Sequence, residues 1–307
     1  MLCAHLDTVP VTPPIVPVLG DDGTWRDERG GVLGADNKAT VAALLVLADR
    51  WSRWPPPVPV ELLLTVQEEP QLRGVTALDP TTLRARTGYV VDHPSPFGGV
   101  VLGAPGHLRF EARFRGRAAH AGIAPEAGRS AVRAAARAVL ALPQGRLADG
   151  CTVNVAAVSG GPAGADPADP PTNVVPDAAR LVGEVRGPDA DALQRAVDAV
   201  EAALHDAAHE PDEPVDLEIV LEQRFAPYRH RGGDAAVERA SAALRRIGIE
   251  PRPFADAGGS DANVLQLRGI TTVNLSGGNR DAHRAGESVD DEDLSRTVAL
   301  LDGLVRG

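Results

Sequence analysis

The chain has 307 residues, of which 43% are hydrophobic, so it can bury a substantial core in one or two domains. Its formal net charge of −11 argues against nucleic acid and anionic membranes as partners. No segment approaches the roughly 20 apolar residues of a membrane span. The two cysteines, Cys3 and Cys151, lie far apart in the sequence and give no disulfide framework. We therefore expect a cytoplasmic protein.

Apolar runs that end in possible metal ligands recur along the first third of the chain. The first run leads into His5 and Asp7, and the run that begins at Gly88 ends at Asp92. An aspartate near a metal-binding histidine can accept a hydrogen bond from the imidazole and so orient it. A histidine near an aspartate is more often incidental when it occurs alone, so the signal lies in the repetition of the pattern.

Two further carboxylate positions follow the same pattern. Asp36 precedes an apolar run, residues 39–51, which predicts a buried helix; the alternative role for Asp36 is that of an N-cap. Glu68 and Glu69 follow residues 60–66, a predicted strand that is too apolar to be half exposed. Adjacent carboxylates at the end of a buried strand are costly unless positive charge compensates them, whereas in a solvated loop they need no partner.

Together with His283, these positions supply two histidines and three or four carboxylates, with no thiolate. Nitrogen and oxygen ligands of this kind suit Zn²⁺ or its neighbours. The surplus of carboxylates is explained if one of them bridges two metal ions about 3.5–4 Å apart, although the spacing does not identify the bridge. Ligands at strand ends fit an open α/β sheet, whose binding crevice lies at the carboxyl ends of its strands.

The middle of the chain has a different pattern, in the order β-α-β-β-α-β, which is typical of a ferredoxin-like module. Alternating hydrophobic residues predict the first strand, and helical periodicity predicts the two helices. The α/β pattern then resumes with a helix near residues 235–247, a strand at 273–275 and a helix at 293–305. The predicted elements of the module are residues 107–115, 129–142, 151–158, 179–185, 190–208 and 215–221.

These motifs together resemble the dinuclear-zinc peptidase family that contains peptidase T, aminoacylase, acetylornithine deacetylase and carboxypeptidase G. The likeness is greatest to the peptidase T-like branch and runs over nearly the whole chain. It implies an α/β catalytic domain, residues 1–105 with 226–307, that binds two Zn²⁺ ions, with Co²⁺ or Mn²⁺ as substitutes. It also implies an inserted ferredoxin-like lid and dimerisation domain, residues 106–225, and therefore a homodimer.

The resemblance also assigns roles to the residues of the predicted metal site. Asp36, in the sequence Gly-Ala-Asp-Asn-Lys, would bridge the two ions, and Asp7 would orient a ligand histidine. Glu68 would be the general base. The metal ligands would be His5, Asp36, Glu69, Asp92 and His283.

Other motifs resemble the family's substrate-binding residues. His120, in Ala-Ala-His-Ala-Gly, would cross the dimer interface and polarise the scissile carbonyl, while Asn173 and Arg186 would hold the substrate. Gly258 and Gly259 would face the substrate through their backbone near the start of a helix. Taken alone, His120 reads as an ordinary loop histidine and Arg186 as a surface strand residue.

The chain departs from the family pattern at its start. Family members have a helix and at least one strand ahead of the His-x-Asp motif, which begins here at residue 5. We therefore expect a truncated chain whose first strand lacks a neighbour normally supplied from upstream of Met1, and which is poorly soluble or inactive by itself. Pro70, after the glutamate pair, and Arg284, where a small hydroxyl residue is usual, are smaller departures that remove no ligand.

The predicted function is metal-dependent hydrolysis of the amide bonds of di- or tripeptides. Two alternatives stay within the family: deacylation of N-acyl amino acids, and carboxypeptidase activity. They differ in which substrate terminus the pocket recognises, and the sequence does not reveal this. An alternative from another class is a truncated, non-catalytic protein that binds metal or dimerises. The presence of Glu68 together with every predicted ligand argues against it.

Overall fold

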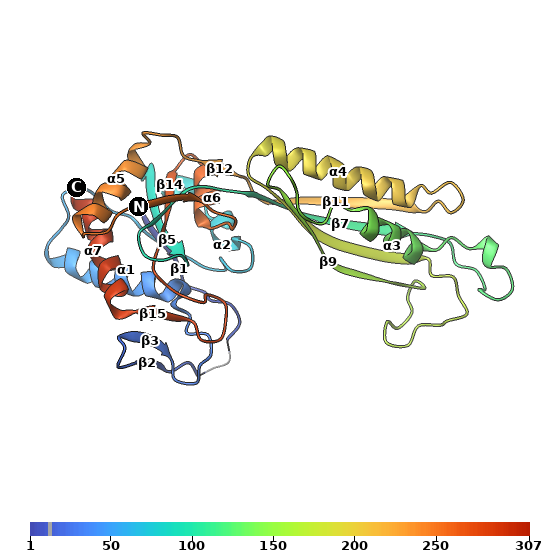
Figure 1. Cartoon of the computed structure of the whole chain (residues 1–307), viewed down its shortest axis with the longest axis horizontal. Helices are drawn as coiled ribbons and strands as arrows, with labels where there is room; N and C mark the ends of the chain where they lie inside the picture. The colour runs from blue at the N-terminus through green and yellow to red at the C-terminus, as the bar shows by residue number, and fades with distance from the viewer. Residues whose placement is uncertain (12–13) are drawn as a thin grey trace. The chain divides into compact units, whose positions relative to one another are not determined.

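The computed structural model describes residues 1–11 and 14–307, which form two compact units (Figure 1). Unit 1 comprises Met1–Ala104 and Tyr228–Gly307, and unit 2 comprises Pro105–Pro227. The domain boundaries predicted from the sequence, 105/106 and 225/226, differ from these divisions by one and two residues. None of the helices in the described part of the chain is long and apolar enough to cross a bilayer.

Unit 1 is built around a sheet with the strand order β12-β6-β14-β5-β1-β4, in which β13 also pairs with β6. The strands β4, β1, β5 and β14 run parallel, so their carboxyl ends share one edge of the sheet. The bounds of the strands are β1 (Leu2–His5), β4 (Leu62–Thr65), β5 (Thr87–His93), β6 (Gly99–Ala104), β12 (Tyr228–Arg229), β13 (Arg252–Ala255) and β14 (Thr271–Ser276).

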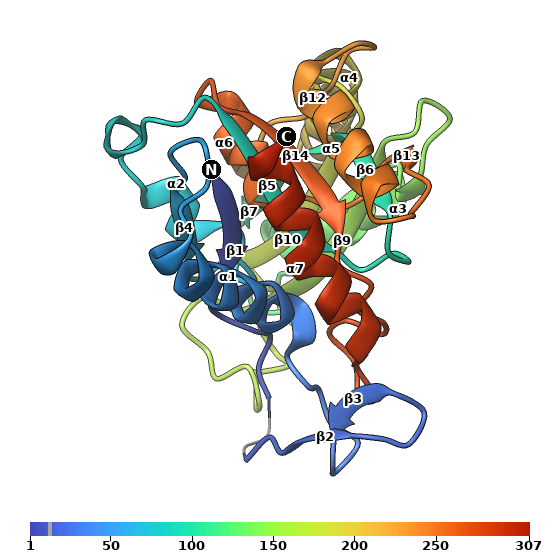
Figure 2. The same ribbon diagram turned by 90° about the vertical axis from the view of Figure 1, so that its left-hand side faces the viewer.

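Helices cover both faces of this sheet. Helices α1 (Ala35–Arg53) and α7 (Asp291–Arg306) lie side by side and, with α5 (Ala235–Arg246), bury the leucines of one core (Figure 2). Leu2 and Ala4 of β1 point into this core. Cys3 points to the opposite face, as strand alternation requires, and there it contacts Asp261 at the start of α6 (Asp261–Leu267). The short α2 (Arg73–Ala77) packs beside α6.

A small second sheet in unit 1 pairs β15 (Ser288–Asp290), β3 (Thr24–Asp27) and β2 (Pro17–Leu19). It joins the beginning of the chain to the segment that leads into α7. Trp25 strengthens this link because its indole N–H donates to Asp291, 2.9 Å away. The loop between β14 and β15, which carries His283, is therefore fixed at both of its ends.

Strand β1 lies inside the sheet, between β4 and β5. This confirms the predicted interior position, but the expectation that one neighbour comes from upstream of Met1 is wrong. The edge strand is β4, in which Leu62 and Leu64 are 39% and 37% exposed. The prediction that the apolar run 60–66 is fully buried is therefore also wrong. Sheet order decides which strand lacks a neighbour, and a local run of leucines carries no information about that order.

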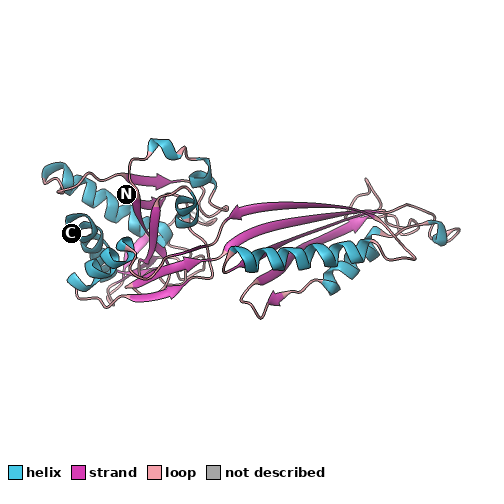
Figure 3. Ribbon diagram, turned by 90° about the horizontal axis from the view of Figure 1, so that it is seen from above, coloured by secondary structure: helices cyan, strands magenta, loops and turns pink. Residues whose placement is uncertain are grey.

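Unit 2 is an antiparallel sheet with the strand order β11-β7-β10-β9-β8 and two helices, α3 and α4, along one face (Figure 3). The element order confirms the predicted ferredoxin-like module, to which β8 is a short addition. The bounds are β7 (Gly106–Arg115), α3 (Ala131–Ala141), β8 (Gly145–Arg146), β9 (Thr152–Gly161), β10 (Ala178–Gly187), α4 (Ala190–Ala208) and β11 (Asp216–Phe225), with a 3₁₀ turn at Pro125–Ala127.

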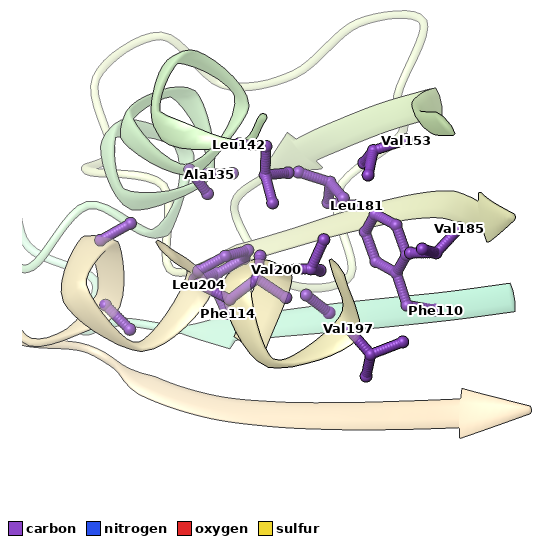
Figure 4. Packing of buried hydrophobic residues seen from close by; sticks show 14 of the residues in the cluster. Phe110, Phe114, Ala135, Leu142, Val153, Leu181, Val185, Val197, Val200 and Leu204 are labelled. Atoms are coloured by element: carbon purple, nitrogen blue, oxygen red, sulfur yellow. The ribbon is translucent and has the colours of Figure 1, made fainter. Parts of the chain in front are cut away.

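Strand alternation gives the unit 2 sheet one apolar and one charged face. Phe110 and Phe114 of β7 point toward the helices and meet Val197, Val200 and Leu204 of α4 (Figure 4). The helix α4 begins at Asp189, whose side chain accepts a hydrogen bond from the backbone N–H of Ala192, as an N-cap does.

The opposite face of the unit 2 sheet carries ion pairs. Glu111 is almost fully buried there and accepts hydrogen bonds from Arg109, Arg113 and Arg180 at 2.7–3.0 Å. These three guanidinium groups, Arg180 most of all, hold the pKa of the Glu111 carboxyl well below its usual range. The charged face is thus an organised network, and the arginines on it are fixed in place.

Exposed leucines on an edge strand predict self-association, because an unpaired strand edge can pair with another chain. We expect the double substitution Leu62→Lys and Leu64→Lys to reduce concentration-dependent aggregation, measured by light scattering, without lowering the melting temperature. The matched control is Leu267→Lys, since Leu267 is 64% exposed but lies at the end of α6. Equal aggregation of the double variant and the control would contradict the prediction that the unpaired edge of β4 drives self-association.

Candidate metal centre

The carboxyl ends of the parallel strands in unit 1 bring the predicted ligands together. His5 ends β1, Asp92 is the next-to-last residue of β5, and Glu69 follows β4. Asp36 lies in the first turn of α1, and His283 lies in the loop after β14. A cavity of about 250 Å³ opens at this edge, and its lining includes Asp36, Glu68, Asp92, Gly258, Gly259 and His283.

Asp36 occupies the centre of the cluster, because its two carboxylate oxygens face different histidines. Oδ1 lies 3.2 Å from Nε2 of His5, and Oδ2 lies 3.3 Å from Nε2 of His283. Asp92 approaches the same nitrogen of His5 at 3.2 Å, and Glu69 approaches that of His283 at 3.1 Å. The cluster thus has two halves, each with one histidine and one carboxylate, and the two halves share Asp36.

Asp7 connects the histidine of one half to the glutamate pair. Nδ1 of His5 lies 3.0 Å from the backbone oxygen of Asp7 and 3.6 Å from its carboxylate. The same carboxylate accepts hydrogen bonds from the backbone N–H groups of Glu68 and Glu69, at 3.0 and 3.2 Å. Asp7 is therefore positioned to fix the ring of His5 and the backbone of the loop that follows β4.

Two residues without a predicted role hold parts of the cluster in place through hydrogen bonds. Glu287 is fully buried, and its two oxygens accept hydrogen bonds from the backbone N–H groups of Gly34 (2.7 Å) and Asp36 (2.8 Å). Asn37 donates from its side chain to the backbone oxygen of Val91 at 2.8 Å and to the carboxylate of Asp92. Asn37 belongs to the Gly-Ala-Asp-Asn-Lys motif and Glu287 follows His283 by four residues, but no spacing rule distinguishes their roles.

The cavity wall contains another pair that the sequence did not indicate. His93 lines the cavity together with Asp256. Their side chains approach to 3.2 Å, and the ring of His93 packs edge-on against Phe254. The position of His93 directly after Asp92, at a strand end, is the signal that would have placed it here.

The pKa values of the cluster reflect buried negative charge. Burial opposes ionisation of Asp36, but hydrogen bonds from His283 and His5 outweigh it and hold the pKa of Asp36 well below its usual range. Burial also disfavours the charged form of His5, yet Asp36 and Asp92 raise the pKa of His5 to about 12. The contact with Asp36 raises the pKa of His283 to about 9. Burial, followed by the charge of Asp92, raises the pKa of Glu68 to about 10.

The donor set fits divalent cations. His5, Asp36 and Glu69 can each offer a ligand atom such that the atoms all lie within 4.8 Å of one another. Oε1 of Glu69 is buried and has no hydrogen-bond partner, and a buried carboxylate oxygen in that state is costly without a cation. Imidazole and carboxylate ligands without thiolate suit zinc and related ions.

The remaining predicted residues lie in unit 2. His120 and Asn173 are both exposed. They lie close together, because the backbone N–H of Ala121 donates to the backbone oxygen of Asn173 at 2.8 Å and residue 120 forms a β-bridge with residue 174. Asn173 precedes the start of β10 at Ala178. Arg186 lies at the far end of the same strand, where it is paired in register with His107. The structure therefore brings His120 and Asn173 together and places Arg186 far from both.

Comparison with known proteins identifies the family. A model described as the peptidase dimerisation domain matches residues 102–212. The protein YqjE of Bacillus subtilis (strain 168), described as uncharacterised, is 31% identical over 306 residues, or 98% of this chain and 79% of the relative. The crystal structure of aminopeptidase PepT from Bacillus cereus ATCC 10987 is 31% identical, with a TM-score of 0.86, over 99% of this chain and 79% of that one. The chain belongs to the M20 peptidase family.

A second solved structure has a similar fold. The crystal structure of a tripeptidase from Staphylococcus aureus subsp. aureus Mu50 is 27% identical, with a TM-score of 0.88, over 99% of this chain and 79% of that chain. Family membership confirms the predicted fold class and makes the chain a peptidase that carries a dimerisation domain. The roles of individual residues remain predictions, and the geometry above supplies the means to test them.

The buried contacts of Glu287 lead to a prediction about metal affinity. We expect Glu287→Gln to weaken Zn²⁺ binding about 10–100-fold, the usual effect of losing a group that orients a ligand, because the hold on the backbone of Asp36 is weakened. Calorimetric titration with Zn²⁺ measures this. The matched control is Glu292→Gln, whose side chain is 71% exposed on α7. Unchanged affinity in a folded Glu287→Gln variant would show that Glu287 does not position Asp36.

Proposed function

We propose that this M20 metallopeptidase cleaves the amide bonds of di- and tripeptides with two Zn²⁺ ions held on either side of Asp36. The observation that carries this proposal is that the two oxygens of Asp36 face different histidines, at 3.2 and 3.3 Å. Each histidine also has a carboxylate of its own, Asp92 beside His5 and Glu69 beside His283. Such an arrangement is what a shared, bridging carboxylate requires.

In this proposal the ligands are divided between two ions. His5 and Asp92 would hold the first ion, and Glu69 and His283 the second, while Asp36 would contact both. Two ions held in this way supply Lewis-acid activation of a water molecule and of the scissile carbonyl.

Glu68 would act as the general base. It lines the cavity, and its backbone is anchored to Asp7, which also contacts His5. A carboxylate so placed would take a proton from the attacking water and pass it to the leaving amine. Burial and the charge of Asp92 raise the pKa of Glu68, so nearby cations would restore the ionised form that a base needs.

The residues of unit 2 would bind the substrate from two copies of the chain. Arg186 lies eight residues along β10 from Ala178, which corresponds to about 26 Å of strand, whereas His120 and Asn173 lie beyond Ala178. A tripeptide spans only about 10 Å, so these groups of one chain cannot all contact one substrate molecule. A homodimer in which one copy supplies His120 and Asn173 and the other supplies Arg186 resolves this.

The apolar edge of unit 2 supports such a dimer. Leu140 of α3 and Val158 of β9 are 87% and 56% exposed and line a shared surface hollow. β9 pairs with β10 along one side, and β8 covers only Thr152 and Val153 on its other side. An open strand edge beside exposed apolar residues is suited to pairing with a second copy of the chain.

The two related activities, deacylation of N-acyl amino acids and removal of a C-terminal residue, are distinguished by a substrate panel. The proposal predicts the highest kcat/KM for peptides of two or three residues with a free amino group. A higher value for N-acetyl amino acids, or for N-blocked peptides cleaved at their C-terminus, would favour the corresponding alternative. Metal binding without turnover of any of these substrates would favour the alternative of a non-catalytic protein that binds metal or dimerises.

The division of the glutamate pair into base and ligand is tested by comparing two substitutions. We expect Glu68→Ala to lower kcat by about 10²-fold or more while the zinc content, measured by elemental analysis, stays nearly intact. Glu69→Ala should lose zinc as well as activity, because Oε2 of Glu69 faces His283 at 3.1 Å. If the two variants retain the same amount of zinc, the assignment of base and ligand is wrong.

A further inference from the structure

Three side chains are linked on the charged face of the unit 2 sheet. One carboxylate oxygen of Glu184 accepts a hydrogen bond from Nε of Arg186 at 3.0 Å, and the other lies 3.1 Å from Nε2 of His107. All three are held by the regular part of the sheet, because β10 pairs with β7 so that Arg186 lies opposite His107.

This arrangement leaves part of the Arg186 guanidinium free. Within residues 1–11 and 14–307, Nη1 and Nη2 of Arg186 have no hydrogen-bond partner, and the side chain is 30% exposed. Nε is already taken by Glu184. The free edge of a guanidinium held in this way presents two parallel N–H donors, which match the two oxygens of a carboxylate.

Glu184 is itself firmly held. The His107 side chain is only 7% exposed and its ring packs edge-on against Phe225, with the ring centroids 5.3 Å apart. The hydrogen bond from His107, followed by that from Arg186, lowers the pKa of Glu184 to about 2, so the carboxylate keeps its charge at neutral pH. The contacts therefore form a chain from a buried histidine, through a fixed carboxylate, to an exposed guanidinium.

We propose that Glu184, anchored by His107, is a positioning residue that orients Arg186 to bind the terminal carboxylate of the substrate peptide. This rests on the proposed function, in which Arg186 contacts substrate. Arginine side chains lose considerable conformational freedom when they are fixed, and pre-organisation removes that cost from the binding step. Glu184 acts through Arg186 and needs no contact with the substrate.

The experiment compares a tripeptide that has a free terminal carboxylate with the same tripeptide amidated at that end. Glu184→Ala should raise KM for the free peptide about tenfold with little change in kcat, and should leave KM for the amidated peptide unchanged. Glu184→Gln keeps an oxygen that can accept from Nε of Arg186, so it should retain most of the wild-type KM. The control is Glu222→Ala, since Glu222 forms the same kind of ion pair with Arg224, two residues along β11.

Arg186→Ala separates failure of this inference from failure of the proposed substrate contact. If Arg186→Ala raises KM selectively for the free peptide but Glu184→Ala does not, Glu184 has no positioning role. If Arg186→Ala does not distinguish the two peptides, Arg186 does not bind the carboxylate, and both proposals are overturned. Glu184→Ala should add nothing in an Arg186→Ala background. An additional effect there would show that Glu184 acts by another route, such as stabilising the sheet, and would also overturn the inference.

Discussion

The structure of unit 1 depends on the crowding of negative charge at one edge of its sheet. Asp7, Asp36, Glu68, Glu69 and Asp92 gather there around the imidazoles of His5 and His283. Parallel strands force this gathering, since β1, β4, β5 and β14 all deliver their carboxyl ends to the same edge. Buried carboxylates cost several kcal/mol each when they are unpaired, so the surrounding residues are arranged to hold this charge.

The surrounding contacts explain how the chain sustains such a site. Glu287 fixes the backbone on both sides of residue 35, and Asn37 ties α1 to the end of β5. The loop that carries His283 is strained, because His283 and Asp281 have φ values of 67° and 53° in the left-handed region. Strain of this kind persists only where surrounding contacts over-determine the conformation, and here β14 and β15 fix the two ends of the loop.

Much of this was accessible from the sequence, for identifiable physical reasons. A ligand at the end of an apolar strand, such as Asp92 or Glu69, is visible because strand ends and chemistry coincide in open α/β sheets. The ferredoxin-like order was visible because each of its elements has its own periodicity. Asn37 and Glu287 were missed as supports because their partners are backbone groups, which no side-chain pattern reveals. The link between His107 and Glu184 depends on strand register, which the sequence does not state.

Other errors share the same origin. The exposure of Leu62 and Leu64 follows from the position of β4 at the sheet edge, and sheet order is a property of the whole unit. The neighbours of β1 were misjudged because a strand's pairing partners leave no trace in its own residues. What could be read from the sequence was therefore the type of each element and the residues at its end, whereas the partners across strands required the structure.

The central claim is that Asp36 is shared between two metal ions. Crystals grown with Zn²⁺ and measured at the zinc absorption edge test it most directly, because anomalous scattering locates each ion without reference to its ligands. The account predicts two anomalous peaks in each chain, one on the His5 side and one on the His283 side of Asp36, about 3.5–4 Å apart. A single peak, or two peaks that do not share Asp36, would contradict it.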